Sequence, residues 1–278
     1  MCLYDHPHPS VRYLARTQLA HEPAAALTEL RAAIATSPPA RAILAAQYPA
    51  GFWMHPDHGI APRYRATAWQ LLYLAQLGVG LTPVLTRACE HLLAHNRDDS
   101  GAFRLRRERQ GRSALLSGAL LWAYWQLGYR DPAPCAATWA WLEREGALAD
   151  ADTATLVWVV RAAAVWQQTA LLAPLRARLA AQLTEIAPLP LALTFPVFDQ
   201  PDLLSTLEAL VESLPGAPLP KPWRAWLQSK QGPTDDWPLE KVPGKLWATP
   251  GAVAEPNPWV TLRALRVLRQ SPAPAPAA

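Results

Sequence analysis

The sequence predicts an all-α protein whose helices form two layers. The apolar residues recur with the helical period, and helices that are apolar on every side alternate with helices that have one polar face. No segment alternates polar and apolar residues as strongly as a β-strand would. Of the 278 residues, 51% are hydrophobic and 17% are charged, which suits closely packed helices and excludes a disordered chain.

Three helices are predicted in the first fifty residues. Ser10 is placed to cap the first, VRYLARTQLAH, from its N-terminal side. The second opens at Glu22 and ends near Ser37, where two prolines follow, and the third covers residues 40–48. Proline is frequent, with 29 residues in the chain, and most prolines fall at such helix boundaries.

The middle of the chain alternates between two kinds of helix. A helix that is apolar nearly all round must be enclosed, and this kind covers residues 63–77, 113–127 and 153–166. A helix with one polar face meets water, and this kind covers residues 83–95, 133–145 and 171–185. Their alternation predicts two concentric layers of helices. Later helices are expected at residues 202–213, 222–230 and 258–269.

A short pattern recurs at three helix ends. It consists of a turn with Gly or Asp, followed by an aromatic residue that packs back onto the neighbouring helix. The copies are 47–53, 96–103 and 231–237, and the aromatics Trp53 and Phe103 are 50 positions apart. A period of this size is typical of stacked helical hairpins. The sequence therefore predicts one domain over residues 1–270, followed by a disordered Pro/Ala tail at 271–278.

Composition also indicates where the protein works. No apolar run is long enough to span a membrane, and the first residues lack the pattern of a secretory signal. Three widely separated cysteines do not suggest a disulfide framework. We therefore expect a cytoplasmic protein of bacterial type. The net charge of +4 carries no nucleic-acid signature, and no cofactor is predicted.

Four blocks of the sequence carry a family resemblance: 5–14, 62–69, 244–247 and 258–268. With the three turn copies, they resemble the squalene-cyclase and protein-prenyltransferase superfamily, whose repeats end in a Gln, Gly and Trp/Phe turn, and small bacterial proteins within it above all. The resemblance covers most of the chain. It implies an α/α toroid, a helical-hairpin barrel whose inner helices surround an apolar funnel. It also implies an isoprenoid or lipid-like ligand in that funnel.

Aromatic and basic residues are the candidates for binding such a ligand. Tryptophan rings on inner helices stabilise carbocations in cyclases, and arginines bind anionic groups. The candidate residues are Arg63, Tyr64, Arg65, Trp69, Trp122, Trp158, Lys245, Trp247, Trp259 and Arg263. Packing offers an alternative explanation for all of them: the rings fill the core, the arginines pair with internal carboxylates, and the last four close the ring of helices.

Asp150 and Asp152 are the candidate catalytic residues. The segment 149–154 resembles the Asp-x-Asp-Asp-Thr-Ala motif with which class II terpene cyclases protonate an alkene from a dry pocket. Ala151 stands at the place of the proton-donating Asp, so any cyclase-like or prenyltransferase-like activity would be non-standard. The alternative is that one of the two Asp residues caps the following helix.

Other chemistries remain open on the sequence alone. The Arg-rich loop 96–112, with Arg106 and Arg107, suits a diphosphate in a true prenyl-transfer enzyme or peripheral contact with an anionic membrane, or is a solvated loop. Asp131 and Cys135 lack a His at a convincing place to complete a zinc site. The cluster 55–58 could contact a metal, but a turn of this composition is more often a solvated loop, so no metal is predicted. A different class of function is a non-catalytic helical-repeat scaffold whose rim binds a protein partner.

Overall fold

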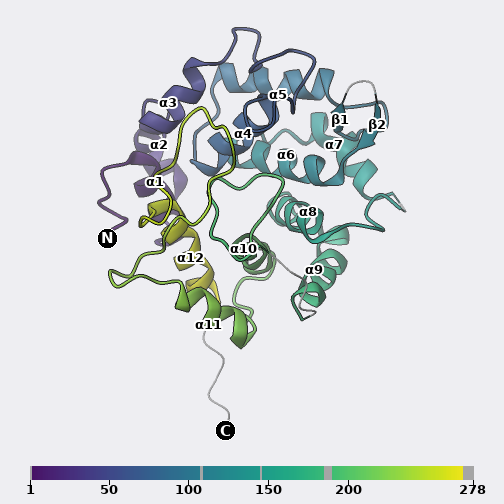
Figure 1. The fold of residues 1–278 in the computed structure, drawn as a ribbon. Coiled ribbons are helices and arrows are strands. Elements are labelled where there is room, and N and C mark those ends of the chain that lie inside the picture. The colour runs from purple at the N-terminus through teal and green to yellow at the C-terminus, as the bar shows by residue number, and fades with distance from the viewer. Residues whose placement is uncertain (1, 107–108, 145, 185–189, 272–278) are drawn as a thin grey trace.

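The all-α prediction is confirmed. The computed structural model describes residues 2–106, 109–144, 146–184 and 190–271, which are mostly helical (Figure 1). Within these ranges, no helix combines the length and the apolar character that a bilayer crossing requires. One feature was not predicted: β1 (Arg104–Arg106) and β2 (Arg109–Arg112) pair as a short antiparallel hairpin inside the Arg-rich loop.

The first helices lie within a few residues of their predicted positions. They are α1 (Pro9–Gln18), the 3-10 helix η1 (Ala24–Leu27), α2 (Thr28–Ile34) and α3 (Pro38–Ala45). The predicted cap was wrong, because the Nδ1 atom of His8 accepts the Ser10 N–H at 3.2 Å and so caps α1. The Ser10 hydroxyl instead donates to the Leu77 carbonyl at 2.7 Å and accepts from the Trp259 indole at 2.9 Å.

The later helices follow in the predicted order. They are α4 (Thr67–Gln76), α5 (Pro83–His95), α6 (Ala114–Leu127), α7 (Pro132–Leu142), α8 (Thr153–Val165), α9 (Thr169–Thr184), α10 (Leu203–Ser213), α11 (Lys221–Ser229) and α12 (Pro258–Gln270). From α4 to α8 the helices alternate as predicted between mostly buried and one-sided ones. Helices α4, α6 and α8 are buried over most of their length, whereas α5 buries a single face.

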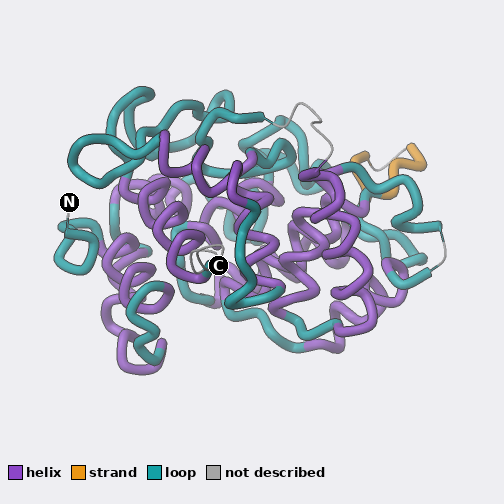
Figure 2. The backbone as a smooth tube through the Cα atoms, turned by 90° about the horizontal axis from the view of Figure 1, so that it is seen from below, coloured by secondary structure: helices purple, strands orange, loops and turns teal. Residues whose placement is uncertain are grey.

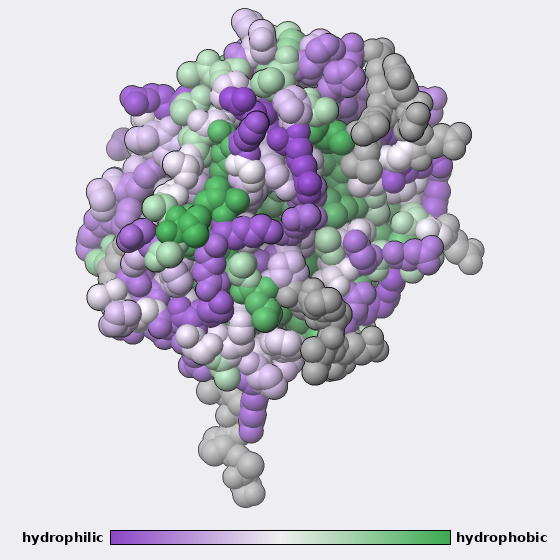
Figure 3. Space-filling model, in the orientation of Figure 1, coloured by the Kyte–Doolittle hydropathy of each residue, from purple (hydrophilic) through white to green (hydrophobic). Residues whose placement is uncertain are grey.

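Contacts between helices run in sequence around a common centre (Figure 1). Helix α4 packs against α6, α6 against α8, α8 against α10, α10 against α12, and α12 against α1. The Ser10–Leu77 hydrogen bond joins α1 to the end of α4. Helices α2, α5, α7 and α9 contact α1, α4, α6 and α8, respectively. Long loops gather at one end of the helices (Figure 2), and hydrophilic residues cross the middle of the face seen in Figure 3.

The recurring turn is confirmed as a structural repeat. Its aromatics Trp53, Phe103 and Trp237 are fully buried. The main-chain N–H of each donates to a hydroxyl on an enclosed helix, and these acceptors are Thr67 at 3.0 Å, Ser117 at 3.2 Å and Thr261 at 2.9 Å. Because the contact has the same form each time, the aromatic anchors the turn to the helix that follows.

The backbone of the turn also repeats. The residue two positions before each aromatic has a positive φ angle: 96° at Gly51, 97° at Gly101 and 57° at Asp235. The two glycines lie against helix backbone, so a Cβ at Gly51 would meet the Arg87 carbonyl at 2.8 Å and one at Gly101 the Ala137 oxygen at 2.0 Å. Glycine is therefore needed at the first two copies for close approach as well as for conformation.

The boundary of the predicted tail needs a correction of one residue. Ser271 is fully buried, and its hydroxyl accepts the Leu219 N–H at 2.7 Å. The domain therefore includes Ser271, while the rest of the predicted tail lies outside the described residues.

Candidate functional site

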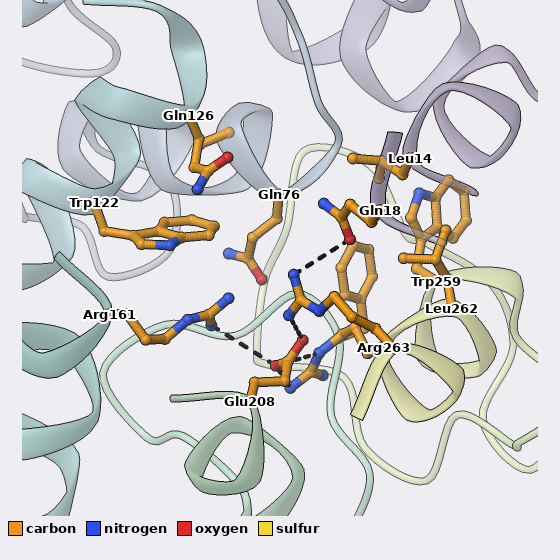
Figure 4. Close-up of a pocket in the computed structure, with 13 residues that line it drawn as sticks. Leu14, Gln18, Gln76, Trp122, Gln126, Arg161, Glu208, Trp259, Leu262 and Arg263 are labelled. Atoms are coloured by element: carbon orange, nitrogen blue, oxygen red, sulfur yellow. Dashed lines mark hydrogen bonds and ion pairs between the residues drawn. The ribbon is translucent and has the colours of Figure 1, made fainter. Parts of the chain in front are cut away.

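A small pocket lies where helices α1, α4, α6, α8, α10 and α12 meet (Figure 4). Its volume is about 40 Å³. Every one of these helices contributes a polar side chain, and together they are Gln18, Gln76, Gln126, Arg161, Glu208, Arg263 and Arg266. Apolar side chains complete the walls, and these are Leu14, Ala75, Trp122, Phe195, Trp259 and Leu262.

Glu208 is the centre of an ion-pair network below the pocket. The residue is 1% exposed, and its Oε2 atom accepts from Arg263 Nε at 2.9 Å. Its Oε1 atom accepts from Arg266, and Arg161 lies 3.7 Å from Oε2. Burial would raise the pKa of Glu208, but the three guanidinium groups outweigh it and lower that pKa to about 2. Glu208 is therefore a carboxylate at neutral pH.

Two further carboxylates balance the arginines. Glu212 accepts from Arg161 Nε at 2.9 Å, and its Oε1 atom lies 2.9 Å from Arg266 Nη2. Asp202 accepts from Arg263 at 3.2 Å. Burial alone would lower the pKa of Arg263, yet Glu208 and Asp202 raise it. The network thus contains three cations and three anions, each paired with an opposite charge.

Several donors in the pocket have no partner among the described residues. The Nε1 atom of Trp122 and the Nε atom of Arg266 are buried and unbonded. The side chain of Gln126 is half-buried and makes no hydrogen bond in this part of the structure. Gln76, in contrast, uses both ends of its side-chain amide: Nε2 donates to the Val197 carbonyl at 2.8 Å, and Oε1 accepts the Val197 N–H at 2.7 Å. The Arg161 guanidinium lies over the Trp122 ring, 4.5 Å from its centroid.

Three of the predicted ligand-binding residues line this pocket. They are Trp122, Trp259 and Arg263. The Trp259 ring stacks on Phe195 with a centroid distance of 5.5 Å. Trp158 lies beside the pocket, where its indole donates to the Phe198 carbonyl at 2.6 Å, and it supports Trp122 from behind with a ring distance of 5.5 Å.

The other predicted basic and aromatic residues gather elsewhere, before α4 and in the loop that precedes α12. Arg63 and Tyr64 both contact Asp199, at 2.8 and 3.2 Å. The Arg65 guanidinium lies 4.0 Å from the centroid of the Trp247 ring. Helix α4 begins only at Thr67, so the prediction that the arginines open an inner helix was wrong, and the Arg63 side chain is 52% exposed.

The remaining two members of the predicted set have separate surroundings. Trp69 is buried in the core, and its indole donates to the Ile60 carbonyl at 2.7 Å. Lys245 is exposed and does not line the central pocket. The predicted set is therefore divided between the central pocket, the core and the surface.

Asp150 and Asp152 do not form an acid site. Both are exposed, and the Oδ1 atom of Asp152 accepts the Thr155 N–H at 2.8 Å as the N-cap of α8. An acid that protonates an alkene needs a dry surrounding, which these two positions lack. The capping alternative explains Asp152, and the catalytic prediction is corrected.

Replacing Asp152 by Ala is expected to lower the free energy of unfolding by about 1 kcal/mol, because α8 loses its N-cap. Urea unfolding followed by tryptophan fluorescence measures this. Asp150→Ala is the matched control at an exposed position two residues away, where we expect a change below about 0.5 kcal/mol. Equal losses in the two variants would contradict the capping role.

The other candidate chemistries receive no support from the described residues. The side chains of Arg106, Arg107 and Arg109 lie outside them. Among the residues that the structure describes, no group of three or more His, Cys, Asp or Glu side chains is placed to hold a metal ion. Burial raises the pKa of the Cys135 thiol to about 12, so it is not a thiolate at neutral pH.

Of the four charged residues that line the pocket, sequence reasoning found Arg263 and missed Arg161, Glu208 and Arg266. Arg161 is the one charged residue of α8, and Glu208 stands among buried apolar residues of α10, which also contains Glu212. A charge on a buried helix requires an opposite charge nearby. That signal was present in the sequence at both positions, although it does not say which charges pair.

Comparisons with known proteins do not assign the chain to a family. Neither a protein-family model, nor a curated protein, nor a solved structure matches the chain.

Proposed function

We propose that the chain is an α/α toroid of the terpenoid cyclase and protein prenyltransferase type that binds a small polar molecule in its central pocket. The succession of contacts from α4 through α12 to α1 supports the toroid. The alternation of enclosed and one-sided helices supports the two layers.

One observation carries the binding function: six helices each place a polar side chain at the same point. A buried ion-pair network gives little or no net stability compared with apolar side chains of the same volume. Stability alone is therefore a poor reason for this polar centre, whereas small-molecule sites combine apolar walls with a few convergent polar groups.

The size of the pocket favours a small ligand over an isoprenoid. Its volume of about 40 Å³ is far below the roughly 300–1,000 Å³ of sites for drug-sized or lipid-like molecules. The polar floor is also unsuited to a hydrocarbon. Because Glu208 is ionised and Arg263 is held as a cation, neither group exchanges protons near neutral pH, which favours binding over acid–base catalysis.

Native mass spectrometry of the purified protein, with thermal-shift screening of small polar compounds, tests this function. We expect at least one such compound to raise the melting temperature of the native protein and not of Gln126→Leu, which removes an unbonded amide from the pocket. Gln228→Leu on the exposed face of α11 is the matched control and should keep the shift.

The same measurement separates the alternatives. A stoichiometric adduct with polyprenyl diphosphates would contradict the proposal and restore the isoprenoid ligand. Failure of both small and isoprenoid compounds to bind would favour the non-catalytic scaffold, because the centre would then be only a packed core.

A further inference from the structure

We infer that the ligand of the central pocket is a small uncharged molecule that presents a hydrogen-bond acceptor, such as the carbonyl oxygen of an amide, urea or ketone. This inference rests on the proposed binding function and adds the chemical class of the ligand.

The first step is the charge balance. Arg161, Arg263 and Arg266 face Glu208, Glu212 and Asp202, so the network is neutral without a ligand. All three arginines are less than 9% exposed. A charged ligand would leave one charge in this buried place without compensation, and such a charge is costly. The charge balance therefore selects against both anions and cations.

The second step is the set of free hydrogen-bonding groups. The indole N–H of Trp122 and the Nε–H of Arg266 have no acceptor among the described residues, and both groups are donors only. The carboxylate oxygens of the ion-pair network already accept hydrogen bonds: both oxygens of Glu208 and both of Glu212 accept from arginines. Among the buried atoms of the residues that line the pocket, the unfilled capacity is therefore on the donor side, so a complementary ligand brings an acceptor.

The third step is size. One water molecule needs a cavity of roughly 10–15 Å³ on the same kind of measure, so about 40 Å³ holds a ligand of a few non-hydrogen atoms. The rings of Trp122 and Trp259 and the side chain of Leu262 belong to the apolar part of the wall. A molecule with one carbonyl group for the free donors and one or two methyl groups for the apolar wall matches this pocket.

Acetamide and acetate form a matched pair of probes, because they have nearly the same shape and differ in charge. We propose to titrate each into protein with ¹⁵N-labelled tryptophan, at constant ionic strength, and to follow the indole N–H resonances. Trp122→Phe assigns the Trp122 signal. If Trp122→Phe does not fold, Gln126→Leu provides a second route to the assignment. Residue 126 lies one helical turn after Trp122, so this substitution changes the surroundings of the Trp122 indole.

Acetamide is expected to move the Trp122 resonance in a saturable way, with an affinity at least tenfold higher than that of acetate. The Trp166 indole, which donates to the Leu121 carbonyl at 2.7 Å, is the internal control and should not move. Acetate binding as tightly as acetamide would overturn the neutral-ligand inference and leave pocket binding intact. If neither probe moves Trp122 in folded protein, the inference is overturned, and failure of the thermal-shift screen as well would remove the proposed function.

Discussion

Replacing Glu208 by Gln is expected to destabilise the protein by about 3–5 kcal/mol at neutral pH, the usual loss when one partner of a buried ion-pair network is removed. The substitution keeps the size of the side chain and removes its charge. Arg161, Arg263 and Arg266 would then share two carboxylates, and α8, α10 and α12 would meet at an uncompensated buried cation. Urea unfolding followed by tryptophan fluorescence measures the loss.

Glu143→Gln is the matched control for this experiment. Glu143 is exposed at the end of α7, so the same chemical change should alter stability by less than about 0.5 kcal/mol. A Glu208→Gln variant as stable as Glu143→Gln would show that the network does not hold the helices together.

The effect of Glu208→Gln depends on pH in a defined direction. The pKa of Glu208 falls from 4.5 to about 2 on folding, so its stabilising contribution is complete above about pH 4.5 and is lost as the pH falls toward 2. The stability difference between native protein and variant should therefore shrink below pH 4.5. Burial, and then His6 and Arg12, also lower the pKa of His8, to about 4, but His8 is present in both proteins and cancels from the difference.

The helices of this protein were predictable because their signals are local. Proline, capping residues and apolar periodicity placed α5, α6 and α12 at or within a residue of their observed bounds. The start of α4 was missed by four residues, and the reason is visible in the backbone. Tyr64 has a φ angle of 65°, which interrupts a helix at a position where the sequence shows only apolar and basic residues.

The candidate site was predictable only in part because its contacts are distant in sequence. Trp122, Trp259 and Arg263 stood out by residue type and helix position. The pairing of Arg263 with Glu208 joins helices that lie more than fifty residues apart, and a single sequence contains no information about which charges meet. Whether the centre is open also depends on how large side chains from six helices, such as those of Trp122 and Trp259, fill the space between them.

Replacing Gly101 by Ala is the second substitution with a large expected effect, about 2–4 kcal/mol of lost stability. A positive φ angle alone costs a non-glycine residue about 1 kcal/mol. The added Cβ would also lie 2.0 Å from the Ala137 carbonyl oxygen on α7, a contact that forces the turn and the helix apart. Urea denaturation measures the decrease in the free energy of unfolding.

Two other glycines turn this prediction into a series. Gly216 has a φ angle of 84° and nothing within 4 Å of the place that a Cβ would take, so Gly216→Ala measures the conformational cost alone, about 1 kcal/mol. A Cβ added at Gly51 would lie 2.8 Å from the nearest backbone atoms. The stability loss of Gly51→Ala is therefore expected to lie between those of Gly216→Ala and Gly101→Ala. Equal losses at all three positions would contradict the close approach of the turns to α5 and α7. The predicted order, with Gly101 the most sensitive, would show that the first two copies of the turn are held against α5 and α7 through direct backbone contact.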